Sequence, residues 1–447
     1  MGRALAPAIV ASVLAFNPAS AETLAEALAA AYEDNPTLNA ERAALRATDE
    51  GVPQALSGYR PRISASASAG ISSSLDGSPA LYPRGLSVTV EQPIFSGHRT
   101  TNGLKIAETA VLAGREALRN AEQNTLLSAA QAFMDLVQAQ AILNVRRENV
   151  QFLGEQVRAA DDRLNVGEGT RTDVAQTRAR LAAGEAEYNA AAAALNSAVA
   201  VYEQVIGHRP TSLGAAQSLE SMLPRTLNAA LADAMTAHPA ILAAGYNIDI
   251  AEFNVKVNEG ALLPTVSLSG SLSRNYDAGG PGSVSNSAQV VGRLSVPIYS
   301  GGETSSLVRQ TKEILGQRRI ELDAARDEVR QAVISAWGGL DAARAQITAA
   351  QAQVQAEQLV LSGVTEERNV GQSTTLDVLN AQQDLLTARV ALITAQHDRV
   401  IASYSLFAAI GQLNAERLGL SVQPYDPQHH YVQVRDSWGG LRTPDGR

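Results

Sequence analysis

The sequence predicts a mainly α-helical protein with membrane β-strands, built from one unit that occurs twice. Three observations predict it: the composition, a set of landmarks that return at constant spacing, and a hydrophobic period that changes between helix and strand along each unit. Of the 447 residues, 45% are hydrophobic but only 4% are aromatic. Because aromatic residues usually supply much of a large core, the apolar content must lie mainly in alanine, leucine and valine, which suits closely packed helices.

The composition also excludes several classes of function. The chain has no cysteine, so disulfides, thiolate zinc sites and cysteine nucleophiles are ruled out. With 36 basic and 45 acidic residues the formal charge is -9, and without a long basic run we expect no nucleic-acid partner. No metal-ligand spacing, phosphate loop or nucleophile elbow is present, so we expect no metal, no cofactor and no enzymatic activity. The pair His429-His430 lies in a polar tail and is expected to be solvated.

Residues 1–21 have the layout of a secretory signal peptide. Arg3 precedes an apolar run, and the small-residue triplet Ala19-Ser20-Ala21 precedes Glu22. An alanine-rich N-terminal helix is the alternative, but it has no need of that triplet. Removal of the segment deletes one arginine and no acid, so the mature charge is -9 minus 1, or -10. No uninterrupted apolar stretch of about 18 residues follows, so we expect no transmembrane helix and expect any membrane span to be a β-barrel.

The rest of the chain is an internal duplication. Landmarks of the first half return 203 or 204 residues later: Asn35-Pro36 as His238-Pro239, Pro93-Ile94-Phe95-Ser96-Gly97 as Pro297-Ile298-Tyr299-Ser300-Gly301, and Asn165-Val166-Gly167 as Asn369-Val370-Gly371. Such a nearly constant offset is the signature of a structural repeat. We expect the first repeat over 22–215, the second over 216–422, and an irregular tail over 423–447.

Each repeat begins with a helical stretch and then alternates between apolar and polar residues. Residues 23–58 are expected to be helical with a break at Asn35-Pro36. The alternation predicts strands at about 61–71, 85–95, 264–274 and 288–298. Each is about ten residues long, as a tilted membrane strand is. A half-buried sheet in a soluble sandwich would show the same alternation; the signal peptide favours the membrane.

The strand ends and the strand number both bear on the membrane interpretation. Five aromatic residues lie near strand ends, which suggests interfacial girdles: Tyr59, Tyr82, Phe95, Tyr276 and Tyr299. Four strands cannot enclose a lumen, because bacterial membrane barrels begin at eight and open edges cannot face lipid. We therefore expect several copies to share one barrel, continued by their helices.

A very long helix is expected after each strand pair, over about 99–164 and 303–368. Some 66 residues correspond to roughly 100 Å. Both helices end at an Asn-Val-Gly turn, where glycine permits the left-handed conformation that closes a helix. The returning helices carry apolar residues every seven positions, Val174 to Tyr202 in one and Val378 to Leu406 in the other, interrupted by Arg399. This spacing predicts a left-handed coiled coil.

From about Glu22 to Gly411 the sequence resembles the TolC family of outer-membrane channels. The resemblance rests on the doubled Pro-Ile-Phe/Tyr-Ser-Gly and Asn-Val-Gly motifs, with Thr172-Asp173-Val174 and Asp377-Val378-Leu379 just beyond the latter. It implies a homotrimer with a 12-stranded β-barrel in the outer membrane and an α-helical coiled-coil barrel across the periplasm. It also implies docking to a periplasmic adaptor (membrane fusion) protein and an inner-membrane RND or ABC transporter. The function implied is passive export of drugs or secreted polypeptides, in efflux or type I secretion.

The resemblance also implies a closed periplasmic aperture. By position, Thr172 and Asp173 fall in a latch region and Asp377 in an acidic ring. The sequence departs from the best-known family pattern at Asn380, Ser373 and Arg368, in place of an acid, an arginine and a tyrosine. One ring of three Asp377 carboxylates is expected, with a repulsion of about 3 kcal/mol per pair at about 6 Å and an effective dielectric near 20. Alternatively, Asp173 and Asp377 only cap their helices.

Two further groups of residues are singled out by the resemblance. The tips, expected to dock the adaptor, are Asn165, Val166, Gly167, Asn369, Val370 and Gly371; their alternative role is only to turn the chain. The strand-to-helix passages are marked by Pro93, Gly97, Pro297 and Gly301. A periplasmic adaptor or structural coiled-coil protein is the alternative function, although it would need only one helical hairpin. A secreted enzyme lacks an acid, base and nucleophile constellation.

Overall fold

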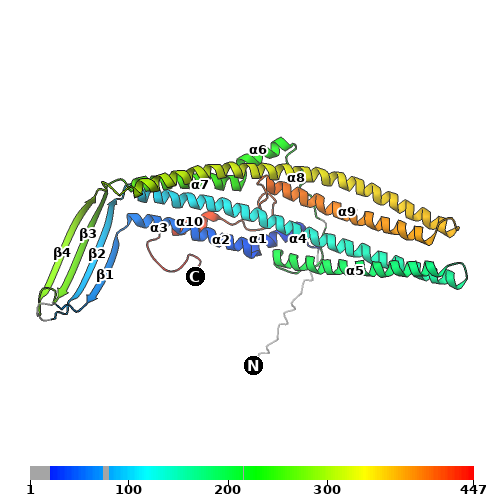
Figure 1. Cartoon of the computed structure of the whole chain (residues 1–447), viewed down its shortest axis with the longest axis horizontal. Coiled ribbons are helices and arrows are strands. Elements are labelled where there is room, and N and C mark those ends of the chain that lie inside the picture. Colours follow the sequence, from blue (N-terminus) through cyan, green and yellow to red (C-terminus); the bar gives the residue numbers. More distant parts are fainter. Residues whose placement is uncertain (1–20, 74–79, 215, 447) are drawn as a thin grey trace, which may run out of the picture.

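The computed structural model describes residues 21–73, 80–214 and 216–446, and the molecule is elongated (Figure 1). Four strands lie at one end and the tips of two long helical hairpins at the other. The expected signal peptide, 1–21, falls outside the described residues apart from Ala21. The predicted fold class is confirmed: most of the chain is helical, and its strands form one small sheet.

The elements follow the duplicated order expected from the landmarks. The first half contains α1 (Leu24–Asp34), α2 (Pro36–Asp49), α3 (Gly51–Leu56), the 3-10 helix η1 (Ser57–Tyr59), β1 (Arg62–Ala69), β2 (Arg84–Phe95), α4 (Arg99–Asn165) and α5 (Arg171–Ile206). The second half contains η2 (Glu220–Met222), α6 (Leu227–Ala237), α7 (Pro239–Gly260), β3 (Thr265–Tyr276), β4 (Val284–Ser295), α8 (Glu303–Asn369) and α9 (Thr375–Ala409), and the chain ends with α10 (Pro427–Val434).

The two halves match closely in helix length. Helices α4 and α8 have 67 residues each, and α1 and α6 have 11 each. They differ where α2, α3 and η1 in the first half correspond to the single helix α7 in the second. Gly51 and Pro53 lie at this break, and 203 residues later the sequence has Asn254 and Lys256. Proline cannot donate a helical hydrogen bond and glycine weakens a helix, so only the first half is broken.

The sheet is antiparallel with the order β1-β2-β3-β4, so β1 and β4 form its edges. Arg62 pairs with Glu91 in the first hairpin, and Val88 with Leu272 where the two repeats meet. The register shifts at Pro93, which has no amide hydrogen for the ladder. The second hairpin continues further than the alternation indicates, to Tyr276 and Val284, because Asp277 closes a short turn by accepting a hydrogen bond from the Gly282 amide at 2.7 Å.

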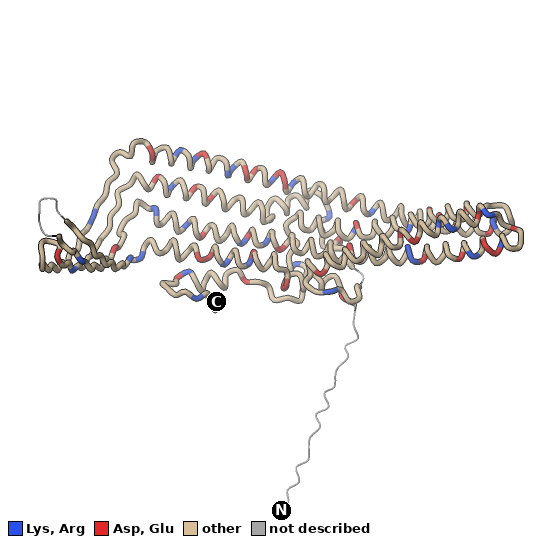
Figure 2. Tube along the Cα trace, turned by 60° about the horizontal axis from the view of Figure 1, so that its bottom comes forward, with Lys and Arg blue, Asp and Glu red and all other residues tan. Residues whose placement is uncertain are grey.

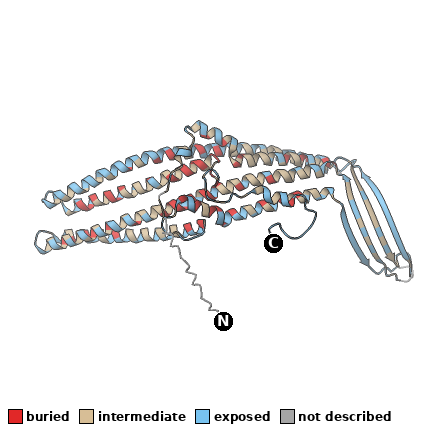
Figure 3. Ribbon diagram, turned by 180° about the vertical axis from the view of Figure 1, so that it is seen from behind, coloured by how far each residue is buried: buried red, intermediate tan, exposed pale blue. Residues whose placement is uncertain are grey.

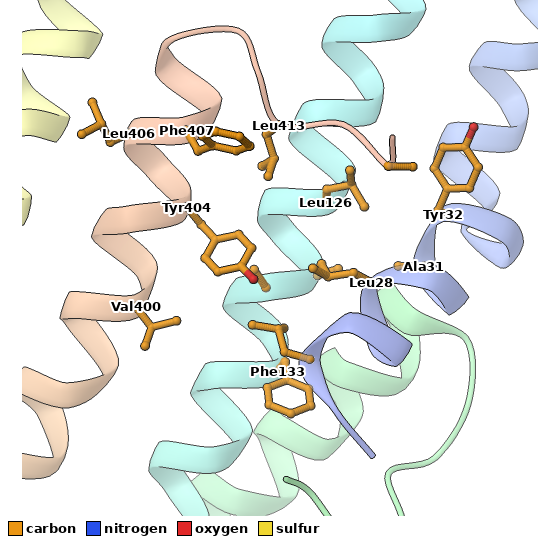
Figure 4. Close-up of a cluster of buried hydrophobic side chains, with 14 of the residues drawn as sticks. Leu28, Ala31, Tyr32, Leu126, Phe133, Val400, Tyr404, Leu406, Phe407 and Leu413 are labelled. Atoms are coloured by element: carbon orange, nitrogen blue, oxygen red, sulfur yellow. The ribbon is translucent and has the colours of Figure 1, made fainter. Parts of the chain in front are cut away.

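The main core lies midway along the molecule, where α1, α4, α5 and α9 meet (Figures 3 and 4). Leu28, Leu126, Phe133 and Phe407 are among its fully buried side chains. One stretch of α4 is long and apolar enough on average to suit a membrane span, although no such helix was expected from the sequence. The stretch qualifies by its average hydropathy, although polar residues interrupt its apolar sequence, and 44% of it is buried inside the molecule. Those buried residues form part of the core.

The prediction of an irregular tail over 423–447 is wrong for part of the segment. Residues Pro427–Val434 form α10, because Asp426 accepts a hydrogen bond from the Gln428 amide at 2.8 Å and proline suits the first helical position. The expectation that both histidines of the tail are solvated is also wrong for His430. Its Nδ1 lies 2.9 Å from Oδ2 of Asp49, a residue that is only 1% exposed. The tail is therefore packed against α2.

Candidate functional site

The two hairpin tips have the same construction. Helix α4 ends at Asn165 and α5 begins at Arg171, while α8 ends at Asn369 and α9 begins at Thr375. Each turn contains a glycine with positive φ, +83° at Gly167 and +78° at Gly371, which a side chain would disfavour. Val166 and Val370 are each 71% exposed. Each tip thus presents an apolar side chain to solvent.

Asp173 and Asp377 both cap their helices, as one of the two sequence interpretations expected. Oδ2 of Asp377 accepts hydrogen bonds from the Thr374 amide at 2.9 Å and the Thr374 hydroxyl at 2.6 Å, and the Asp377 amide donates to that hydroxyl at 3.2 Å. Asp173 makes the same capping box with Thr170. The Thr374 hydroxyl and amide lower the pKa of the Asp377 carboxyl. Asp377 is therefore an exposed, charged group at neutral pH.

The remaining predicted aperture residues have separate partners. The Ser373 hydroxyl donates to Glu367 at 2.7 Å, Asn380 accepts from Arg180 at 3.0 Å, and Thr172 is exposed. Arg368 donates to Gln156 of α4 at 2.6 Å and to the adjacent Asn369 at 3.3 Å. Burial lowers the pKa of Arg368, with a smaller contribution from Arg163. Among the side-chain hydrogen bonds of the described residues, only the one from Arg368 to Asn369 joins two of the predicted site residues, and on the backbone the Gly371 amide donates to the Arg368 carbonyl at 3.1 Å.

Polar ties between the hairpins were missed by sequence reasoning. Besides Arg180–Asn380 and Arg368–Gln156, they include Gln382 to Asn149 at 3.0 Å, Arg389 to Glu148 at 3.3 Å, Gln138 to Thr394 at 3.2 Å, and His397 to Asp135 at 2.7 Å. A groove of about 610 Å³ near the tips is lined by α4, α8 and α9. Each of these ties joins residues at least 200 positions apart, and no local pattern marks such pairs. Figure 2 shows acidic and basic residues interspersed along the helices and at the tips.

One carboxylate joins the segment between α5 and α6, called the linker below, to the second hairpin. Glu220 of η2 accepts hydrogen bonds from Arg399 Nε at 2.6 Å and from Arg344 Nε at 3.1 Å. These contacts, with that of Arg399 first, lower the pKa of Glu220. Arg399 is the residue that interrupts the apolar seven-residue row of α9. The interruption is explained by this ion pair, which tethers the linker to α8 and α9.

The two strand-to-helix passages have equal backbone shape but unequal surroundings. Gly97 and Gly301 both have positive φ, +64° and +66°. A Cβ added to Gly97 would lie 2.3 Å from the carbonyl oxygen of Gly260, whereas one added to Gly301 would meet nothing within 4 Å. Pro93 is half-buried and Pro297 is exposed. The first passage is packed against α7, and the second has no such cover within one chain.

Comparison with known proteins agrees with this architecture and its duplication. The family described as "Outer membrane efflux protein" matches the chain twice, over residues 27–208 and 230–412. The outer membrane efflux protein BepC of Brucella suis is 47% identical over 98% of this chain and 95% of its own length. The outer membrane protein TolC of Escherichia coli is 26% identical over 89% of this chain and 84% of its own length.

Solved structures show the same fold. The CmeC outer membrane channel of Campylobacter jejuni superposes with a TM-score of 0.78 at 18% identity, over 92% of this chain and 89% of its own. The MtrE outer membrane channel of Neisseria gonorrhoeae, in its open state, gives a TM-score of 0.73 at 19% identity, over 88% and 90% of the two chains. The duplicated hairpins, the four-stranded sheet and the two family matches lead to one conclusion: this chain belongs to the outer membrane efflux protein family, located in the outer membrane and reaching into the periplasm.

Proposed function

We propose that three copies of the chain close a 12-stranded barrel in the outer membrane and continue it as a helical tunnel. Each copy contributes two repeats, 22–215 and 216–422, and therefore four strands. Antiparallel sheets expose hydrogen-bonding edges that lipid cannot satisfy. Both edge strands, β1 and β4, are exposed along their whole length, and pairing β4 of one copy with β1 of the next would remove every edge.

The unequal passages carry this proposal. In the second repeat Ile298 and Tyr299 are 94% and 86% exposed, whereas in the first repeat Ile94 and Phe95 are 61% and 36% exposed. Helix α4 packs against α2, α3 and α7, but α8 packs against α7 on one side only in this region. A neighbouring copy would supply the missing α2 and α3 to α8. The second passage would then be covered as the first one is.

The assembly is tested by gel migration and conductance. Heating should convert a slowly migrating trimer to a monomer, and the purified unheated protein should form ion-conducting pores in planar bilayers. A purified protein that is monomeric and soluble without detergent would rule out the shared barrel. The alternative of a periplasmic adaptor or structural coiled-coil protein is not favoured, since it needs one hairpin and no membrane sheet, and the family match spans both repeats.

We further propose that Asp377 forms an acidic ring at the tunnel's periplasmic aperture, together with Thr172, Asp173, Ser373, Asn380 and Arg368 as neighbours. Its exposed and charged carboxylate supports this role, and both capping bonds from Thr374 go to Oδ2 rather than Oδ1. Divalent cations should block conductance in the wild type and block it less in Asp377→Asn. Unchanged block would exclude Asp377 from the constriction.

We propose that the tips dock the helical hairpins of a periplasmic adaptor protein. The exposed valines Val166 and Val370 support this, as does the nearby groove between the hairpins. A Cβ at Gly167 would meet nothing within 4 Å, so Gly167→Trp adds a bulky obstacle at the tip and some backbone strain. We expect it to abolish transport while trimers still assemble; retained transport would argue against docking there.

The inner-membrane partner is proposed to be an RND or ABC transporter, and the cargo to be drugs or secreted polypeptides. Among the relatives, AprF of Pseudomonas aeruginosa is named an alkaline protease secretion protein and is 25% identical over 74% of this chain and 70% of its own length. Deleting the gene and comparing drug susceptibility with the secreted proteins would separate the two cargoes. Increased susceptibility alone would assign efflux, and loss of a secreted polypeptide would assign secretion.

A further inference from the structure

The C-terminal segment runs along α4 toward the sheet. The Arg115 guanidinium lies over the Tyr431 ring, 5.5 Å from the ring centroid, and Nη2 of Arg435 lies 3.7 Å from Oε1 of Glu108. The partners on α4 therefore approach the start of that helix as the tail proceeds. Figure 1 shows α10 beside α2 and the following segment running first toward the sheet and then turning back to the C-terminus. The residues directly after α10 thus approach the level at which helices give way to strands.

Trp438 is held at this level by Arg60, two residues before β1. The Arg60 guanidinium lies 4.5 Å from the centroid of the Trp438 ring, and its Nη1 donates to the Ser437 carbonyl at 2.5 Å. Tyr59 is the residue before Arg60, and its carbonyl accepts a hydrogen bond from the side chain of Gln92, near the end of β2, at 2.9 Å. The Trp438 ring is therefore fixed beside the first residues of β1 and the last of β2.

The segment leaves large apolar side chains uncovered. Trp438 is 75% exposed despite its contact with Arg60, and Leu441 is fully exposed. An exposed tryptophan fixed in place costs conformational freedom without burying apolar area in the protein itself. Tryptophan and tyrosine accumulate at the headgroup level of membranes, where a flat ring with a polar N–H is partly apolar and partly wet.

We propose that Trp438 and Leu441 form an interfacial anchor that inserts into the phospholipid headgroup region of the periplasmic leaflet of the outer membrane. Tyr59, Phe95 and Tyr299 are 46%, 36% and 86% exposed at the same ends of the strands, so Trp438 extends an aromatic girdle from a segment far along the chain. Arg60 and the exposed Arg442 supply positive charge for phosphate groups. The occupant of this surface is lipid.

The chain offers a direct fluorescence test, because it has only two tryptophans. Trp337 lies 34 residues beyond the start of α8, packed against the helical core, which places it about 50 Å along the helix from the sheet. Trimers of Trp337→Phe, which retains Trp438, and of Trp438→Phe, which retains Trp337, would be reconstituted into phosphatidylcholine vesicles. The lipids would carry bromine either close to the headgroup or deep in the acyl chain.

We expect shallow bromines to quench Trp438, with a greater loss of emission than deep bromines give, and neither lipid to quench Trp337. Aqueous iodide should quench Trp438 less in vesicles than in detergent. Emission from Trp438 that is insensitive to brominated lipid and fully accessible to iodide would overturn the proposal. Should Trp337→Phe fail to assemble, the difference between the wild-type and Trp438→Phe spectra supplies the same measurement. Arg60→Ala should reduce the quenching of Trp438, since the ring loses its support.

Discussion

Gly97 and Gly301 occupy equivalent places in the two repeats, but only Gly97 is crowded within one chain. Gly97→Ala requires a positive φ that alanine disfavours and places Cβ 2.3 Å from the Gly260 carbonyl oxygen, a backbone atom that cannot move independently. We expect a loss of more than about 2 kcal/mol in stability. The measurement is the yield of heat-modifiable trimer and the temperature at which it dissociates.

Gly301→Ala separates the two contributions. In a single chain this change meets open space, and only the cost of the positive φ, about 1 kcal/mol, applies. If a neighbouring copy covers the second passage, as we propose, the loss in the trimer should approach that of Gly97→Ala. A mild effect on trimer dissociation would show that the passage stays uncovered. Gly103→Ala, in open space within α4, is the control expected to leave the trimer as stable or more so.

Thr374 is the residue through which Asp377 is fixed at the start of α9. Thr374→Ala removes the acceptor for the Asp377 amide and the hydroxyl that binds its carboxylate. We expect a local loss of about 1 kcal/mol, seen as faster hydrogen exchange in the first turn of α9. Because the hydroxyl bond lowers the pKa of Asp377, that pKa should rise toward its ordinary value near 3.8 in the variant. Thr172→Ala is the control, because it leaves both capping boxes intact. Unchanged hydrogen exchange in the first turn of α9 of Thr374→Ala would contradict the role of the cap.

At the scale of elements, Glu220 ties η2 to both helices of the second hairpin. Its folded-state pKa is lowered from the ordinary 4.5, so the stabilisation is fully present above pH 4.5 and is lost as the pH falls through the lowered value. Glu220→Gln should therefore lower the midpoint of thermal unfolding at pH 7, by an amount equivalent to about 1 kcal/mol. The difference from wild type should shrink in acid.

A matched control comes from Glu203, whose exposed carboxylate lies 3.5 Å from Arg209. Glu203→Gln should change the unfolding midpoint little at either pH, because an exposed ion pair contributes between about 0 and 1 kcal/mol. Equal effects of the two substitutions would mean that the Glu220 contacts are no more than surface pairs. The outcome also bears on Arg399, the charged residue that interrupts the row of apolar positions in α9.

Local patterns were sufficient to predict the repeated elements but not the contacts between them. The long helices were expected over about 99–164 and 303–368, and α4 and α8 end within one residue of those limits, because the Asn-Val-Gly turns that end them are local signals. The packing of the tail was misjudged because His430 contacts the distant Asp49, although the Asp426 cap and Pro427 that start α10 are themselves local signals. The ties between the hairpins, such as Gln382 to Asn149, depend in the same way on how two coils meet.

At the scale of the whole molecule, the duplication predicts how neighbouring copies should pair. Inside one chain the two repeats meet at β2 and β3, with Val90 opposite Gly270. The equivalent residues are Leu294 of β4, 204 positions after Val90, and Ala67 of β1, 203 positions before Gly270. If every boundary between repeats in the barrel has the same register, Leu294 of one copy lies opposite Ala67 of the next.

The absence of native cysteine makes this register directly measurable. Directly opposed Cβ atoms lie about 4.5–5.5 Å apart, close enough for a disulfide after small adjustments. The double variant Ala67→Cys/Leu294→Cys should therefore form covalent trimers under oxidising conditions, which a heated, non-reducing gel would resolve from monomer. Ile63→Cys/Leu294→Cys is the control, because Ile63 shares the face of Ala67 but is displaced by four residues, about 13 Å along the strand. This double variant should stay monomeric after heating.

Crosslinking of the control but not of Ala67→Cys/Leu294→Cys would show that the boundary between copies has a different register from the boundary between repeats. No crosslinking in a whole series along β1 would show that β4 and β1 do not meet.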